Sequence, residues 1–286
     1  MRKAGILYHP MIEAAHALAE KLEDFLKSLG ISVWLYSAWE WEKAKPIAAG
    51  TDLILCVGGD GTILRAAQVA LEGSVPITGI NLGRLGFLTE LGADEAEARI
   101  PDLLQGKGWV DERAMLEGEL LMPGKEASLY YALNDVVVAR GAISRLIHVE
   151  AQIDGELLTT YRADGVIVAT ATGSTGYALA AGGAILHPQA EEFLLLPILP
   201  HLSSSYSLVL PAKSVVKLCV STPHQAVLSV DGHINLLIPN GSVVTVRHSG
   251  KRARFLRIHR GTNFYGSLEK KLKGKQQGES SRKSQD

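Results

Sequence analysis

The sequence predicts an α/β fold followed by a mostly β fold, and two patterns along the chain support that prediction. In roughly the first 120 residues, short apolar runs alternate with segments of helical spacing, which is typical of a parallel sheet with right-handed crossovers. Beyond Glu112, apolar runs follow one another closely and turn signals separate them, which is typical of consecutive strands. We therefore expect two domains of different class.

Within the α/β part, apolar spacing defines each element in turn. Apolar residues recur at helical spacing from Ile12 to Leu29, and Gly30 is a typical C-terminal stop. After Asp52, the run at 52–57 is apolar, as in a buried strand, and Thr62 is a suitable N-cap for the helix after it. The expected elements are strands at 6–8, 31–36, 52–57 and 75–80 and helices at 12–29 and 63–71.

In the β part, dipeptides typical of tight turns separate the apolar runs. Asp154-Gly155, Asp231-Gly232 and Asn240-Gly241 are the clearest of them. One helix is expected after Thr175. The expected strands are 114–122, 129–140, 146–153, 156–161, 165–170, 208–220, 226–230, 234–238, 243–247 and 253–258.

Glycine and proline cluster at 106–125, where we place the domain boundary. We expect an α/β domain over 1–115 and a β-rich domain over 116–266. Residues 267–286 carry six basic and three acidic residues but only two large apolar ones, so they are expected to form a disordered tail.

Composition excludes several classes of protein. The chain has 286 residues, is 47% apolar and has a formal charge of −1, so it can bury a core and has no general attraction to nucleic acid or anionic membranes. Cys56 and Cys219 are the only cysteines, which excludes a disulfide scaffold and fits a reducing cytosol. Without a signal peptide or a long apolar run, we expect a soluble cytoplasmic protein with no membrane partner.

The strongest local signal is Gly58-Gly-Asp-Gly-Thr62, which follows the 52–57 strand. Glycines let backbone N–H groups approach phosphate oxygens, and a helix N-terminus favours negative charge. An acidic residue in such a cradle repels phosphate unless it has a role, so Asp60 is a candidate general base or metal partner. An ordinary tight turn with a solvated carboxylate explains the motif about as well.

Other nucleotide and metal motifs are absent from the sequence. There is no P-loop, no Gly-x-Gly-x-x-Gly after the first strand and no protein-kinase motif set, so any nucleotide is bound in a different way. None of the nine histidines has the spacing of a zinc site, and we expect no catalytic zinc.

A second glycine-rich turn, Thr172-Gly-Ser-Thr-Gly-Tyr177, follows the 165–170 strand. Its hydroxyls could bind a base or phosphate and the Tyr177 ring could stack on adenine, although a strand-to-helix cap with Tyr177 in the core is the simpler interpretation. Asn134-Asp135, at a strand start, could bind a vicinal diol or could simply be turn residues. The basic stretch from Arg247 to Arg260 is interpreted as a solvated edge hairpin, with phosphate or nucleic-acid binding as the alternative.

The order of these motifs is more specific than any one of them. Gly58-Gly-Asp-Gly-Thr62, Asn81-Leu-Gly-Arg-Leu-Gly-Phe-Leu88, Leu133-Asn-Asp135, Asp164-Gly165, Thr172-Gly-Ser-Thr-Gly-Tyr177 and Ala181-Gly-Gly183 follow one another along the chain. In this order they closely resemble the NAD kinase family over roughly residues 50–260.

This resemblance implies a Rossmann-like α/β domain followed by a β-sandwich-like C-terminal domain, with the active site between them. It also implies a reaction, the transfer of the γ-phosphoryl group of ATP to the 2′-hydroxyl of the adenosine ribose of NAD, which gives NADP. The family implies a homo-oligomer (dimer or tetramer) and a divalent cation, Mg²⁺, which substrate phosphates would largely hold. No protein metal ligand is therefore assigned.

The resemblance also assigns roles by position. Asp60 matches the proton acceptor, and Asn134 and Asp135 match the pair that holds the adenosine ribose. The donor phosphates are assigned to Gly58, Gly59, Gly61 and Thr62. The adenine end is assigned to Thr172, Ser174, Thr175, Gly176, Tyr177, Ala178, Leu179 and Ala180. The remaining dinucleotide contacts are assigned to Arg65, Arg145, Arg162, Asp164 and His233.

The chain departs from the family pattern at a few positions. Ala171 stands where the family commonly has proline, Asp135 replaces a usual glutamate, and Tyr206-Ser207 replaces a usual Arg-Pro. Gly176 replaces an alanine and Ala180 a frequent serine. These departures motivate one alternative, a catalytically silent NAD(P)-binding sensor of the same fold. A related kinase acting on a lipid or sugar hydroxyl is another.

Overall fold

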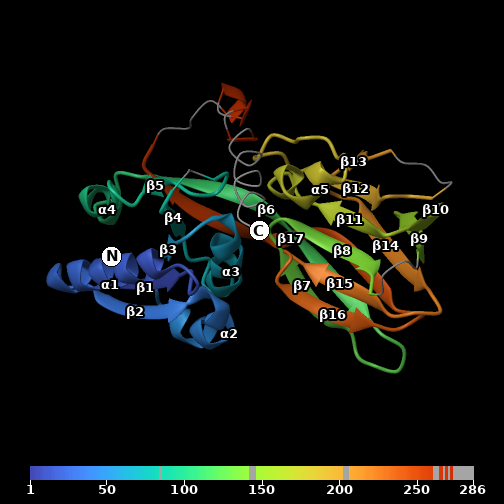
Figure 1. The fold of residues 1–286 in the computed structure, drawn as a ribbon, viewed down its shortest axis with the longest axis horizontal. Helices are drawn as coiled ribbons and strands as arrows, with labels where there is room; N and C mark the ends of the chain where they lie inside the picture. Colours follow the sequence, from blue (N-terminus) through green and yellow to red (C-terminus); the bar gives the residue numbers. More distant parts are fainter. Residues whose placement is uncertain are drawn as a thin grey trace, which may run out of the picture. The chain divides into compact units, whose positions relative to one another are not determined.

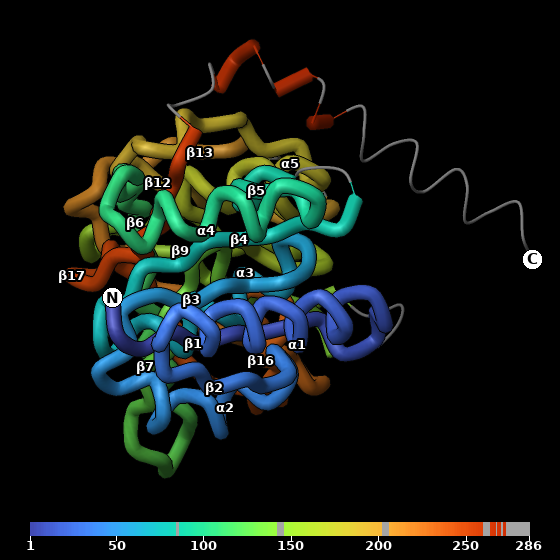
Figure 2. The backbone as a smooth tube through the Cα atoms, turned by 90° about the vertical axis from the view of Figure 1, so that its left-hand side faces the viewer, coloured from blue at the N-terminus to red at the C-terminus, as the bar shows by residue number. Residues whose placement is uncertain are grey.

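The computed structural model describes residues 1–83, 86–141, 146–201, 206–259, 264–266, 268–269 and 271–272. The chain divides into two compact units, Met1–Glu112 with Ala253–Asp286, and Arg113–Arg252 (Figures 1 and 2). No helix in these described ranges is long and apolar enough to cross a membrane. The tail expected at 267–286 lies largely outside the described residues.

A parallel sheet forms the centre of the first unit, which confirms the α/β prediction. Its strand order is β17–β4–β3–β1–β2, where β17 is Val243–Arg257, and β5 pairs with β4. The pairs β1–β2, β1–β3, β3–β4 and β4–β5 are all parallel. The elements are β1 (Lys3–Tyr8), α1 (Glu13–Ser28), β2 (Ser32–Ser37), η1 (Ala38–Glu40), α2 (Trp41–Ala44), η2 (Lys45–Ala48), β3 (Leu53–Val57), α3 (Asp60–Ala70), β4 (Ile77–Asn81), β5 (Leu91–Gly92) and α4 (Ala96–Leu104).

Every residue of β3 is apolar and buried, so both faces of this sheet must be covered. Helices lie on both faces. The α1 side chains Ala15, Ala19, Leu22 and Leu26 are fully buried at helical spacing, and they join α4 and alternate residues of β3 in one apolar cluster. On the other face, α3 packs on β3 and β4. The helix α4 was not expected from the sequence.

The second unit consists of two antiparallel sheets. One has the order β10–β9–β14–β17, and the other has the order β13–β12–β11–β8–β15–β16. Its elements are β7 (Ser128–Ala132), β8 (Asp135–Arg140), β9 (Ile147–Ile153), β10 (Glu156–Ala163), β11 (Gly165–Ala169), η3 (Gly173–Thr175), α5 (Tyr177–Ala180), β12 (Phe193–Ile198), β13 (Leu208–Leu210), β14 (Val215–Ser221), β15 (Ala226–Val230) and β16 (Ile234–Ile238).

The core of the second unit lies between its two sheets. Val136 and Val138 of β8 share one buried cluster with Val216 and Leu218 of β14. Each pair is separated by two positions, because alternate residues of a strand point to the same face. Inward-facing residues from both sheets make a β-sandwich, as the family resemblance implied.

Several strands differ from their expected bounds. The run at 129–140 is two strands, because the chain leaves β7 after Ala132 and begins β8 at Asp135. The run at 208–220 is likewise broken between Leu210 and Val215. The strand β12 was missed, and the expected helix after Thr175 is only the short α5.

The compact units divide the chain differently from the sequence pattern. The strands β6 (Trp109–Leu121) and β17 (Val243–Arg257) each run from one unit into the other. The start of β17 pairs with β14, whereas Phe255 near its end pairs with Ile77 of β4. Residues from Ala253 onward therefore group with the first unit. The sequence pattern had instead placed strands at 243–247 and 253–258 in the β-rich part, and the structure has a single strand there.

Candidate functional site

The glycine-rich loop lies at the carboxyl end of β3, in the first unit. Gly58 has a φ of +155° and leaves no room for a side chain, because a Cβ there would lie 2.4 Å from Oγ1 of Thr62. The helix α3 begins at Asp60 with Gly59 as its N-cap, so the expectation that Thr62 is the N-cap was wrong. Gly58, Gly59 and Gly61 thus surround a helix N-terminus, which suits an anion.

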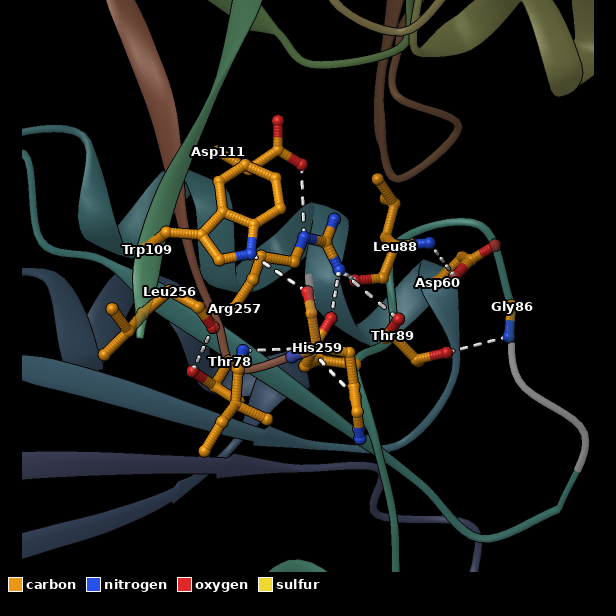
Figure 3. Close-up of polar contacts among 12 residues, drawn as sticks. Asp60, Thr78, Gly86, Leu88, Thr89, Trp109, Asp111, Leu256, Arg257 and His259 are labelled. Atoms are coloured by element: carbon orange, nitrogen blue, oxygen red, sulfur yellow. Dashed lines mark hydrogen bonds and ion pairs between the residues drawn. The ribbon is translucent and has the colours of Figure 1, made fainter. Parts of the chain in front are cut away.

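The Asp60 side chain is held by the loop that follows β4. The backbone N–H of Phe87 donates to Oδ2 over 3.0 Å. That of Leu88 donates to Oδ1, also over 3.0 Å (Figure 3). Gly86 lies against the same carboxylate. Two backbone donors fix the orientation of a half-buried carboxylate, which is what a positioned proton acceptor requires.

Arg65 lies one helical turn after Gly61 on α3. Its Nη1 donates to the Gly61 carbonyl oxygen over 3.0 Å, and its guanidinium stacks 4.0 Å from the centre of the Trp39 ring. Partial burial lowers the pKa of Arg65 from its ordinary value, but an arginine remains charged at neutral pH. A cation is therefore placed beside the loop.

In the second unit, Asp231 organises the start of β8. Its carboxylate accepts the N–H groups of Leu133, Asn134 and Asp135 over 2.9, 2.7 and 3.1 Å. Asp231 has a φ of +50°, which Asp tolerates better than most residues, and Gly232 follows it at +69°. Burial, together with the negative charge of Asp231, raises the pKa of Asp135 to about 7.

The second glycine-rich turn packs directly on Asn134. The N–H of Thr170 donates to the Asn134 carbonyl oxygen over 2.8 Å, and the N–H of Gly173 donates to Oγ1 of Thr170 over 3.0 Å. A Cβ on Gly173 would lie 2.1 Å from the same Asn134 oxygen. Oδ1 of Asn134 is buried and has no hydrogen-bond partner among the described residues. An unsatisfied buried acceptor of this kind suits a ligand hydroxyl.

These residues border a pocket of about 430 Å³ on the face of β8, β15 and β16. Tyr177 of α5 lies at this pocket and is 49% exposed, so its ring can stack on a planar group. The pocket is lined by Asn134, Asp135, Val137, Ala139, Arg140, Tyr177, Val227, Ser229, Asp231, Gly232 and Asn235. Its size and its mixture of apolar and polar groups suit a nucleoside.

The other expected residues of the second unit do not line this pocket, although Asp164 and His233 contact residues that do. Asp164 pairs with Arg140 over 2.9 Å, and Nδ1 of His233 lies 3.2 Å from the Asp231 carbonyl oxygen. Thr172 accepts a hydrogen bond from Arg113 over 3.4 Å. Arg162 accepts the N–H of His201 at its carbonyl oxygen. Ser174, Thr175 and Ala178 are buried in the turn, Leu179 and Ala180 belong to α5, and Arg145 lies outside the described residues.

Sequence reasoning missed the role of Asp231. Asp231-Gly232 indicated a turn, and it is one, but the carboxylate acts on residues 96 to 98 positions earlier in the chain. Arg140, Ser229 and Asn235 were missed too, since a strand residue gives no local sign that it faces a pocket. Within the described residues, no group of three His, Cys, Asp or Glu side chains could hold a metal ion.

Comparisons with known proteins identify the family. The family model for the ATP-NAD kinase N-terminal domain matches residues 5–108, and the model for the ATP-NAD kinase C-terminal domain matches residues 133–258. An NAD kinase of Dehalococcoides mccartyi is 48% identical over 96% of each chain, and one of Chloroflexus aurantiacus is 38% identical over 96% of this chain and 99% of its own.

Solved structures agree. Yeast NADH kinase complexed with NADH has a TM-score of 0.82 at 26% identity and covers 94% of this chain and 87% of its own. An NAD kinase from Archaeoglobus fulgidus in complex with ATP has a TM-score of 0.73 at 30% identity and covers 91% and 94% of the two chains. The fold and its glycine-rich loop are thus those of a nucleotide-dependent kinase. The chain belongs to the ATP-NAD kinase family, which confirms the resemblance drawn from its motifs.

Proposed function

We propose that this chain transfers the γ-phosphoryl group of ATP to the 2′-hydroxyl of the adenosine ribose of NAD, giving NADP and ADP. The curated relatives are NAD kinases, and one of the similar structures holds ATP and another NADH. The single observation that carries the chemistry is the Asp60 carboxylate, which two backbone N–H groups orient at the N-terminus of α3.

Asp60 accepts the proton of the ribose 2′-hydroxyl as the new O–P bond forms and the bond between the γ-phosphorus and the β,γ-bridging oxygen breaks. A ribose hydroxyl is a weak nucleophile, and a positioned base contributes about 10²–10⁴-fold to the rate. The Gly58–Thr62 loop binds the donor phosphates through backbone N–H groups, with Arg65 as a nearby cation. A divalent cation such as Mg²⁺, held by the substrate phosphates, would supply charge neutralisation there.

The pocket of the second unit binds the adenosine part of NAD. Asn134, Asp135 and the Asp231 turn supply acceptors for ribose hydroxyls, and Tyr177 stacks on the base. The family resemblance assigns the segment from Thr172 to Ala180 to the adenine end, and Arg162, Asp164 and His233 to further contacts with the dinucleotide. Arg145, assigned with them, lies outside the described residues. Nothing in the comparisons favours a silent sensor or a lipid or sugar kinase.

The test is NADP formation from NAD, ATP and Mg²⁺, with Asp60→Asn beside the wild type. We expect NADP from the wild type and a loss of about 10²–10⁴-fold in kcat for the variant. Asp24→Asn, at an exposed position on α1, serves as the matched control and should keep wild-type activity. A variant at Asp60 that is as active as the control would contradict the role of that carboxylate.

We also propose that the enzyme is a cytoplasmic homo-oligomer, a dimer or tetramer, on the basis of the family resemblance. Light scattering after size exclusion gives the mass directly. A monomer at the concentration of the activity assay would count against the proposal.

A further inference from the structure

We infer that Arg257 is a positioning residue for Asp60: it holds the 86–90 segment whose backbone N–H groups orient the carboxylate. This inference rests on the proposed function, in which Asp60 is the proton acceptor. Arg257 lies at the end of β17, far from Asp60 in sequence, and its hydrogen bonds within the described residues go to Asp111 and to residues 88–90 rather than to Asp60 or the glycine-rich loop.

The Arg257 guanidinium binds the 86–90 segment at three points. Its Nη1 donates to the carbonyl oxygens of Leu88 and Thr89 over 3.1 and 3.4 Å, and to Oε2 of Glu90 over 3.2 Å (Figure 3). The Leu88 peptide is therefore held at its carbonyl oxygen by Arg257, while its N–H group holds Asp60. A movement of Leu88 therefore changes its contact with Arg257 and its contact with Asp60 together.

The other end of the guanidinium is anchored by a buried carboxylate. Nε of Arg257 donates to Oδ2 of Asp111 over 3.1 Å. Arg257, Glu90 and Asp111 are only 7%, 8% and 3% exposed. Oε1 of Glu90 accepts the N–H groups of Ile258 and His259 over 2.9 and 2.8 Å, which fastens the segment to the chain just after β17.

The planar fork of an arginine is what spans these partners. Nε and Nη1 point in different directions from one rigid group, so one side chain reaches Asp111 and Leu88 together. A lysine keeps the positive charge between the two carboxylates but has a single nitrogen, and it cannot hold both ends. Arg257→Lys is therefore the informative variant, and Arg254→Lys is its matched control. Arg254 is on the same strand, and among the described residues its ion pair is with the exposed Glu112.

We expect Arg257→Lys to lower kcat at least tenfold, since a displacement near 1 Å at a reacting group costs up to about 10²-fold. The KM for ATP and for NAD should stay within about twofold, because the binding groups are elsewhere. In the Asp60→Asn background, Arg257→Lys should change kcat by less than about threefold, because the carboxylate it positions is gone. An equal loss in both backgrounds, or a wild-type kcat for Arg257→Lys, overturns the inference.

A second variant tests the segment without disturbing the buried charges. Oγ1 of Thr89 accepts the Gly86 N–H over 2.7 Å, and Thr89→Val removes that acceptor. If Arg257→Lys fails to fold, Thr89→Val should still lower kcat with unchanged KM, and a wild-type kcat there overturns the inference.

Hydrogen exchange separates this inference from the proposed function. Exchange of the Phe87 and Leu88 amides should be faster in Arg257→Lys than in Arg254→Lys, whether or not the protein makes NADP. A wild-type protein without kinase activity contradicts the proposed function. Faster exchange at 86–90 in Arg257→Lys then still supports the conclusion that Arg257 holds this segment against Asp60. Unchanged exchange contradicts that role of Arg257.

Discussion

A Cβ atom added to Gly86 would lie 2.2 Å from Oδ1 of Asp60, far inside van der Waals contact. The backbone of Gly86 is not in the left-handed region, so alanine can adopt it and the whole strain falls on the carboxylate. We expect Gly86→Ala to lower kcat by about 10²-fold, because the carboxylate must move from its hydrogen bonds to Phe87 and Leu88. Steady-state kinetics with NAD and ATP measure the effect.

The control for this variant is Gly83→Ala in the same loop. The nearest atom to a Cβ on Gly83 is Oδ1 of Asn81 at 3.9 Å, an ordinary contact. Its kcat should stay close to the wild-type value. Equal losses of kcat in the two variants would mean that activity depends on the conformation of the loop in general, and not on the contact between Gly86 and Asp60.

Asp231→Asn should weaken NAD binding more than it weakens ATP binding. One carboxylate accepts three consecutive N–H groups at the start of β8, and an amide offers only one oxygen in its place. Hydrogen bonds to a charged group contribute about 1.5–3 kcal/mol each, so the KM for NAD should rise about tenfold or more. Asn tolerates the positive φ, which keeps the turn itself intact.

A second Asp-Gly turn provides the comparison for that measurement. Asp154 also has a positive φ, precedes Gly155 and accepts the N–H of Val215 over 2.8 Å, but it does not line the pocket. Asp154→Asn should lower the melting temperature slightly and leave the KM for NAD unchanged. A rise in KM for both variants would point to general destabilisation.

Asp135 should make the stability of the protein depend on pH. Its pKa is about 7 in the folded chain and about 4 when unfolded, so between these values the folded state holds a proton that the unfolded state has lost. Stability therefore falls as pH rises from 4 to 7, by an amount on the order of 1–3 kcal/mol. The asparagine of Asp135→Asn cannot ionise, so this contribution to the pH dependence of the free energy of unfolding is absent from the variant.

The melting temperatures of the wild type and Asp135→Asn at pH 5 and pH 8 measure this difference. The melting temperature of the variant relative to that of the wild type should be several degrees higher at pH 8 than at pH 5. Because every other titrating group is present in both proteins, a gap that does not change with pH would contradict the raised pKa.

Local patterns predicted the parts of this fold whose cause is local. The burial of Ala15, Ala19, Leu22 and Leu26 follows from helical spacing, and the position of Asp60 follows from a glycine-rich turn after a buried strand. The simpler interpretation of Tyr177 as a core residue was wrong, because its side chain is half exposed beside the pocket.

The features that were not predicted depend on partners far away in sequence. Arg257 falls in a basic stretch that was interpreted as a solvated hairpin, yet it is buried, because Asp111 and Glu90 arrive from two other segments. Asp231 was interpreted as a turn residue, because no local pattern reveals which N–H groups a carboxylate will accept. Spacing along the chain encodes periodic burial, whereas single long-range ion pairs have no period.

The pairing of β17 with β4 has a consequence for the synthesis of this protein. The first unit is discontinuous, and its last strand contributes Leu256 to the apolar cluster and a carbonyl oxygen to Thr78 from near the C-terminus. A nascent chain that has reached Glu112 therefore still lacks an edge of its sheet and carries two carboxylates, Glu90 and Asp111, whose cation has not been translated. The unit begun first can be completed only after the intervening 140 residues, Arg113–Arg252, have left the ribosome.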